Sequence, residues 1–78
     1  MAQIDLKTIK RIDKDRNAVH TEVQTTYTSF VADGKKYFQI DIYGKVQREM
    51  PGKISQSIQL NKDSALFLIK LLKQEFDV

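Results

Sequence analysis

The sequence contains no cysteine and no tryptophan, and it has only one histidine, one proline and three glycines. Without cysteine, neither a disulfide framework nor a thiolate metal site can form. The lone histidine, His20, has no second imidazole with which it could build a zinc cluster. These absences fit a reducing compartment, so we expect a cytoplasmic protein that carries no metal and no cofactor.

Two further absences concern membranes and size. No apolar run approaches the ~18 residues that a membrane-spanning helix needs. Residues 1–5 lack the basic and apolar regions of a secretory signal peptide. The 78 residues have room for one domain and one core. Because so small a core stabilises a fold only weakly, oligomerisation is a realistic option.

Neither sign of charge is in large excess, since the formal net charge is only +3. The basic residues gather in two clusters, and acidic residues interrupt both of them. The first cluster comprises Lys7, Lys10, Arg11, Lys14 and Arg16, and the second comprises Lys35, Lys36, Lys45, Arg48 and Lys53. This pattern permits a polyanionic partner. It is equally compatible with an ordinary solvated surface of mixed charge.

The feature around which the chain is organised is a β-hairpin that turns at Asp33-Gly34. This pair is typical of a two-residue type I′ turn, in which both central residues have positive φ. Taking Ala32 and Lys35 as the closing pair sets the register of the two strands. The register places Phe30 opposite Tyr37, Thr28 opposite Gln39, Tyr27 opposite Ile40 and Val23 opposite Gly44.

Side chains of the hairpin alternate between two faces. One face is apolar and needs a core to bury it; it carries Val19, Val23, Tyr27, Phe38, Ile40, Ile42 and Val46. The other is polar but holds three aromatic rings; it carries His20, Glu22, Gln24, Thr26, Thr28, Phe30, Tyr37, Gln39, Asp41, Tyr43 and Lys45. Any function of this chain is expected on the polar face.

The remaining patterns complete a ββββα order. Period-two alternation predicts strands over about residues 4–12, 18–31, 36–46 and 53–60, and the first of these segments also fits a short amphipathic helix. Asn61 is a favourable N-cap for a helix over about 62–76. The expected fold class is therefore α+β: a four-stranded antiparallel sheet with one C-terminal helix packed on one face.

The predicted helix carries two apolar stripes. The wider stripe, at helical spacing, is expected to pack on the apolar sheet face and consists of Ala65, Leu68, Ile69, Leu72 and Phe76. A second stripe, Phe67 and Leu71, has no evident cover in a single-sheet monomer. It is expected to form a homodimer interface across a two-fold axis. The alternative is burial under the N-terminal strand or the long loop.

The sequence offers little that could support catalysis. None of the serines stands in a nucleophile-elbow context, and the glycines do not form a phosphate-binding loop. A pocket of the kind that enzymes use is also hard to build in so short a chain. We therefore expect a protein that is not an enzyme.

The polar face is a better candidate for function. Phe30, Tyr37 and Tyr43 can stack nucleic-acid bases, and Lys35, Lys36 and Lys45 can attract phosphates. The basic loop over 45–53, with Arg48 and Lys53, can clamp a nucleic-acid strand. The structural alternatives are an aromatic cross-strand pair that merely stabilises the sheet, and a solvated hairpin loop.

Residues 36–76 resemble the positive cofactor 4 type of transcriptional coactivator. The similarity lies in strand Phe38 to Ile42, the segment Pro51-Gly52-Lys53, an Ile-Ser or Ile-Gln-Leu-Asn stretch, and the amphipathic helix after it. The family's Ile-Ser-Leu stretch fits at Ile54-Ser55 or, about four residues later, at Ile58. The resemblance implies a ββββα fold, dimerisation through the helices and binding of single-stranded DNA on the sheet. It also implies phosphate contacts from Lys36, Lys45, Arg48 and Lys53, and base stacking on Tyr37 and Tyr43.

The leading prediction is thus a homodimeric, non-catalytic module that binds single-stranded DNA or RNA and has no membrane association. The alternative prediction is a small regulatory subunit that holds a protein partner through Phe67, Leu71 or the polar sheet face.

Overall fold

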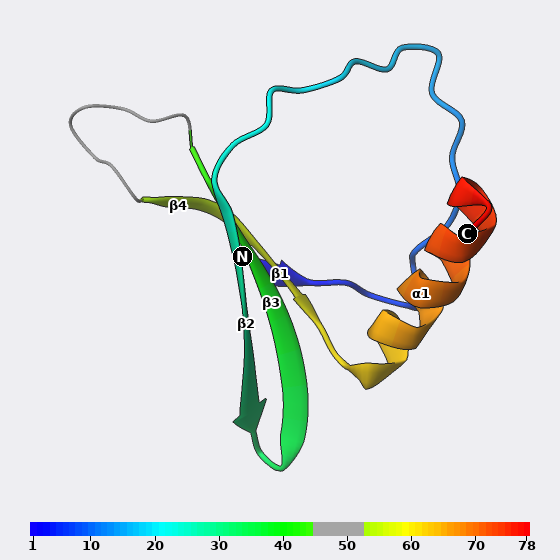
Figure 1. Ribbon diagram of the computed structural model, residues 1–78. Helices are drawn as coiled ribbons and strands as arrows, with labels where there is room; N and C mark the ends of the chain where they lie inside the picture. The colour runs from blue at the N-terminus through cyan, green and yellow to red at the C-terminus, as the bar shows by residue number, and fades with distance from the viewer. Residues whose placement is uncertain (45–52) are drawn as a thin grey trace.

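The computed structural model describes residues 1–44 and 53–78, which form a four-stranded sheet followed by one helix (Figure 1). The strands are β1 (Ala2–Gln3), β2 (Thr25–Ala32), β3 (Lys35–Tyr43) and β4 (Ile54–Leu60), and the helix is α1 (Lys62–Phe76). The α+β class is confirmed, and the bounds of α1 are those predicted.

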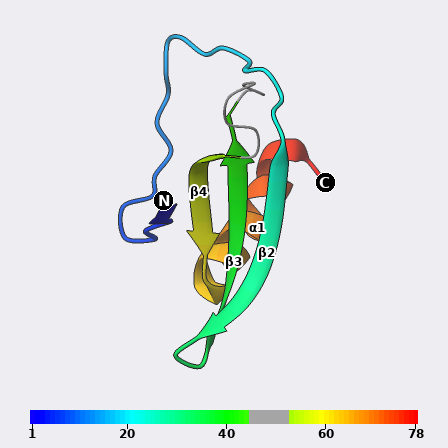
Figure 2. The same cartoon turned by 90° about the vertical axis from the view of Figure 1, so that its left-hand side faces the viewer.

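The strands lie in the order β1-β4-β3-β2, and the sheet is mixed (Figure 2). β2 pairs with β3 and β3 with β4 in antiparallel fashion, but β1 runs parallel to β4. The prediction of a wholly antiparallel sheet is therefore wrong at β1. No tight turn joins β1 to β4, so nothing in the local sequence dictates their relative direction.

The first strand is much shorter than predicted and lies earlier in the chain. Strand structure ends at Gln3, so neither a strand over 4–12 nor the alternative short helix forms. The cause is local: the Asp5 carbonyl accepts hydrogen bonds from the amides of Thr8 (3.2 Å) and Ile9 (3.1 Å). The Asp5 carboxylate also accepts from the Lys7 amide at 2.9 Å. Such Asp-centred turns compete with a β-ladder for backbone groups.

The hairpin between β2 and β3 forms as predicted. Asp33 and Gly34 both have positive φ, 51° and 74°, as a type I′ turn requires. The closing pair, Ala32 with Lys35, is confirmed. The structure also confirms three predicted pairings along the strands: Phe30 with Tyr37, Thr28 with Gln39 and Tyr27 with Ile40.

The far end of the hairpin differs from the prediction. β2 begins at Thr25 rather than near residue 18, and the predicted pairing of Val23 with Gly44 does not form. β3 ends at Tyr43, and the bond from the Tyr43 amide to the Gln24 carbonyl, at 3.0 Å, carries the predicted register one position beyond β2. The predicted extension of β3 to Val46 lies outside the described residues.

Substitution of two glycines, one in the turn and one outside it, tests the assignment of the turn. Gly34→Ala should lower the free energy of unfolding by about 1–2 kcal/mol, because a side chain disfavours the left-handed backbone at that position. Gly44→Ala is the matched control, since its backbone is not left-handed and an added Cβ meets nothing within 4 Å. Urea titration of both variants measures the difference. Equal losses at the two positions would contradict the assignment of the turn.

The start of α1 is held by a capping box. The Asn61 side chain accepts from the Ser64 amide at 2.9 Å, and the Ser64 hydroxyl accepts from the Asn61 amide at 2.9 Å. These bonds satisfy donors that a helix N-terminus otherwise leaves unpaired. The connection from β4 to α1 is therefore a single, tightly held residue.

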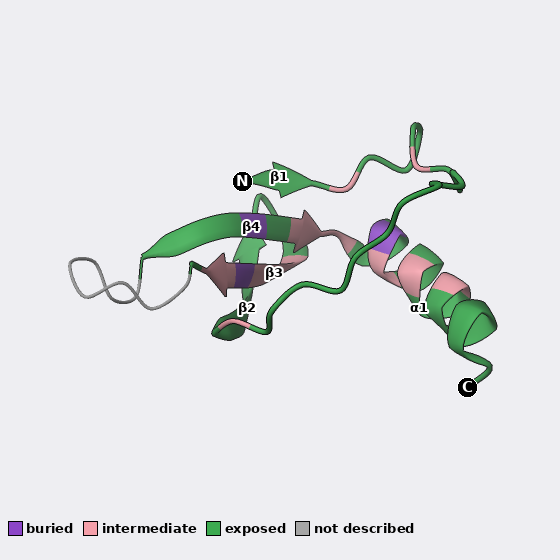
Figure 3. Ribbon diagram, turned by 90° about the horizontal axis from the view of Figure 1, so that it is seen from above, coloured by how far each residue is buried: buried purple, intermediate pink, exposed green. Residues whose placement is uncertain are grey.

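Within the described residues, no hydrophobic side chain is fully buried (Figure 3). The only buried residues there are Asp41, Ser57 and Ser64. The predicted cover of the wider helix stripe by the sheet is wrong at Ile69, Leu72 and Phe76, which are 53%, 50% and 72% exposed. Only Ala65 and Leu68 of that stripe are half-buried.

The half-buried side of α1 is instead the side nearest the N-terminal segment. Leu68 and Leu71 are half-buried, and Glu75 follows them at helical spacing. The Arg11 guanidinium donates to the Glu75 carboxylate at 2.9 Å, which ties the N-terminal segment to the end of the helix. Of the second predicted stripe, Leu71 is half-buried, whereas Phe67 is 40% exposed.

Candidate nucleic-acid interface

The polar face of the sheet carries a stacked aromatic pair at its hairpin end. Phe30 on β2 and Tyr37 on β3 are cross-strand neighbours, and their ring centroids lie 5.5 Å apart with an interplanar angle of 23°. Tyr27 and Phe38 stack in the same way on the apolar face, at 5.4 Å and 25°. Both pairs follow from the register that the type I′ turn sets.

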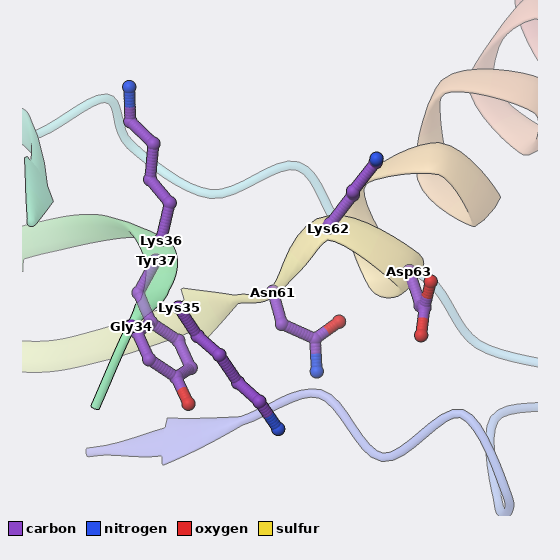
Figure 4. A pocket seen from close by; sticks show the side chains of 7 residues that line it. All are labelled: Gly34, Lys35, Lys36, Tyr37, Asn61, Lys62 and Asp63. Atoms are coloured by element: carbon purple, nitrogen blue, oxygen red, sulfur yellow. The ribbon is translucent and has the colours of Figure 1, made fainter. Parts of the chain in front are cut away.

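Next to Tyr37 the surface forms a hollow of about 360 Å³ between the hairpin turn and the start of α1. It is lined by Gly34, Lys35, Lys36, Tyr37, Asn61, Lys62 and Asp63. Figure 4 shows that Lys35, Tyr37 and the Asn61 amide extend to one side, whereas Lys36 and Lys62 extend to the opposite side. The hollow is thus bordered by cations on both sides of the sheet.

Asn61 and Lys62 were not among the predicted site residues. Their place follows from the β3–β4 register, in which Phe38 pairs with Leu60, so the residues after Leu60 lie beside Tyr37 and Lys36. The signal was present in the sequence, because Leu60 and Phe38 are both apolar strand residues. Because the sequence between β3 and β4 has no two-residue turn pair such as Asp33-Gly34, that signal does not determine the pairing.

A second aromatic residue, Tyr43, lies at the opposite end of β3. Its hydroxyl is 3.2 Å from the Thr26 hydroxyl, and its backbone pairs with Ile54 beyond a shift in register after Ile42. Lys53, which is exposed, directly precedes Ile54 and so lies near this end. Lys45 and Arg48, the other predicted contacts, lie outside the described residues.

Between the two ends, a line of polar side chains crosses from β4 to β3. Asp41 is only 8% exposed, and one of its carboxylate oxygens accepts from the Ser57 hydroxyl at 2.6 Å and from the Gln39 amide at 2.8 Å. The Gln39 side-chain oxygen accepts in turn from the Gln59 amide at 2.7 Å. This polar network holds the central strands in register and places one acidic group in the middle of the face.

The structure therefore brings Phe30, Tyr37 and Lys35 together and separates them from Tyr43 and Lys53. The two tyrosines share one face of β3, six residues apart, which corresponds to ~20 Å of extended strand. Lys36 borders the hollow from the other side of the sheet. In residues 1–44 and 53–78, no group of three His, Cys, Asp or Glu side chains is arranged to hold a metal ion.

Comparisons with protein-family models, curated proteins and solved structures yield no match to this chain. In the part of the chain that the structure describes, no helix has the length and apolar character needed to cross a membrane.

Proposed function

We propose that this chain is a non-catalytic module that binds single-stranded DNA or RNA and acts as a homodimer. The observation that carries the proposal is the stacked Phe30–Tyr37 pair with Lys35 beside it on the polar face. Aromatic rings stack on bases of any sequence, and neighbouring lysines attract the phosphates between those bases. The proposed setting is the cytoplasm.

Different residues of the polar face would contact different parts of the nucleic acid. Phe30 and Tyr37 would hold bases, while Lys35, which extends to the same side of the sheet as Tyr37 (Figure 4), would meet phosphates. A strand that follows β3 would then reach Tyr43 and the exposed Lys53 at the other end. Single strands suit such a surface better than duplexes do, because only unpaired bases can turn their faces to an aromatic ring.

The resemblance of residues 36–76 to positive cofactor 4-type coactivators agrees with this proposal. That family implies base stacking on a sheet and a dimer built with the C-terminal helix. The strand–strand–helix order over this range, β3, β4 and α1, is the order that the resemblance implies.

A second candidate function is a subunit that binds a protein partner. The exposure of Ile69, Leu72 and Phe76 on α1 favours it, because exposed apolar stripes on helices mark interaction surfaces. The two candidates differ in salt dependence, since phosphate contacts weaken steeply with salt and apolar contacts do not.

Fluorescence anisotropy with labelled single-stranded and duplex oligonucleotides at several salt concentrations tests the proposal. We expect micromolar or tighter binding to the single strand, weaker binding to the duplex, and loss of both as salt rises. Absence of binding at low salt would overturn the nucleic-acid function and leave the protein-binding candidate.

A charge variant sharpens this test. Lys35→Ala should reduce the magnitude of the slope of log K against log salt by about 0.7, the value for one phosphate contact on a single strand. Lys70→Ala, which removes an exposed lysine of α1 that does not line the hollow, should leave the slope unchanged. Equal slopes for the two variants would show that Lys35 does not contact phosphate.

A further inference from the structure

Two apolar surfaces remain at least partly exposed in the part of the chain that the structure describes. The first is the apolar face of the sheet, to which Tyr27, Phe38, Ile40, Ile58 and Leu60 contribute. The second is the exposed helix stripe, formed by Ile69, Leu72 and Phe76. None of these eight side chains is fully buried. A sheet face and a helix stripe are the two halves of an ordinary α/β core.

The chain is more open than a compact monomer. It exposes 7462 Å², whereas a compact monomer of 9.1 kDa exposes about 4900 Å². The radius of gyration, 15.0 Å, likewise exceeds the value of about 11.5 Å for a compact chain of this length. Part of the excess surface lies on residues 10–22, all of which are exposed, and part lies on the two apolar surfaces. An obligate homodimer, in which the interface resembles a core divided between two chains, would cover the apolar part.

The chain's own helix lies apart from its own sheet (Figure 1). Asn61 is the sole residue between β4 and α1, and its extended backbone (φ −98°, ψ −177°) is held by the capping box. Figure 1 shows α1 leaving the end of β4 at a sharp corner and running apart from the sheet. In this arrangement the Ile69–Leu72–Phe76 stripe stays exposed and does not cover the chain's own sheet.

We propose that a second copy of this chain covers both surfaces, with the Ile69–Leu72–Phe76 stripe of each copy packed on the apolar sheet face of the other. Each copy covers the other in the same way, so a dimer with one two-fold axis covers the helix stripe and the sheet face of both copies. This inference rests on the homodimer of the proposed function and names its interface. It leaves the polar face of each sheet open to nucleic acid.

Because the chain has no cysteine, single introduced cysteines report contacts without background. One copy, carrying a tag and Ile58→Cys, is co-expressed with an untagged copy carrying Leu72→Cys, and the mixture is oxidised with oxidised glutathione. We expect a tagged–untagged disulfide dimer as the main product on a non-reducing gel. Sedimentation equilibrium of the unmodified chain should give twice the monomer mass.

The matched control pairs Ile58→Cys with Leu66→Cys. Leu66 is also exposed on α1 but lies ~120° around the helix from Leu72, so this pair should cross-link far less. Concentration-dependent melting of the unmodified chain gives a readout that needs no variant: the melting temperature of an obligate dimer rises with protein concentration.

Three results would overturn the proposal. One is a monomeric disulfide in the double variant Ile58→Cys/Leu72→Cys, which would place the helix over its own sheet. Another is efficient self-linking of Leu72→Cys alone, which would indicate a helix-to-helix dimer such as that predicted through Phe67 and Leu71. The third is a monomer mass with a concentration-independent melting temperature, which would point to a different protein partner. All these readouts are independent of nucleic-acid binding, so the two proposals can fail separately.

Discussion

Replacing Asp41 by alanine is expected to lower the free energy of unfolding by about 2–3 kcal/mol. The carboxylate is buried and accepts two hydrogen bonds, from the Ser57 hydroxyl and the Gln39 amide. Alanine leaves the Ser57 hydroxyl buried without its acceptor. It also removes the acceptor of the Gln39 amide, whose side-chain oxygen accepts from Gln59. Donors that are left unpaired in a buried site cost more than the bond itself contributes.

Two variants separate the loss of the network from the loss of a negative charge. Asp41→Asn keeps an acceptor oxygen in nearly the same place, so its loss should be less than half that of the alanine variant. Asp15→Ala removes an exposed acid and should change stability by less than about 0.5 kcal/mol. Urea denaturation at constant protein concentration measures all three. An alanine variant as stable as Asp15→Ala would show that the network contributes nothing.

Replacing Tyr37 by leucine should weaken binding of single-stranded oligonucleotides by about 5- to 150-fold. This range corresponds to the ~1–3 kcal/mol that stacking of one base on an aromatic ring contributes. Leucine keeps an apolar side chain of useful size in the sheet, so the hairpin should persist. The ring lost is half of the Phe30–Tyr37 stack.

The conservative variant Tyr37→Phe distinguishes stacking from other roles of this residue. It retains the ring and removes only the hydroxyl, so binding should stay close to that of the unmodified protein. Circular dichroism of both variants confirms that the sheet is intact. If leucine and phenylalanine weaken binding equally, the hydroxyl rather than the ring is what matters. If neither changes the affinity, the polar face does not stack bases at this position.

The hairpin was predictable because its determinants are local. Asp33-Gly34 specifies one turn type, the turn specifies the register, and the register places Phe30 against Tyr37. The bounds of α1 were predictable for a similar reason, since the cap at Asn61 and the apolar spacing lie within one short segment. Half of the candidate interface follows from this local information.

The rest depends on contacts between distant parts of the chain. The pairing of β1 with β4, and the position of Lys62 beside Tyr37, follow from strand order rather than from any neighbouring turn. The position of the helix was wrongly predicted because amphipathic spacing shows which side chains need cover, not which chain provides it. Ile69, Leu72 and Phe76 have the pattern of core residues and yet are exposed.

The short pairing of β1 with β4 has a consequence for the order of folding. It joins residues from opposite ends of the chain through only two pairs of positions, Ala2 with Ile58 and Gln3 with Gln59. Closing so long a loop for so few contacts is entropically unfavourable until β3 and β4 are already joined. The hairpin should therefore nucleate folding, and the N-terminal segment should dock last. By the same argument, β1 should be the first strand to lose protection from amide hydrogen exchange in the native state.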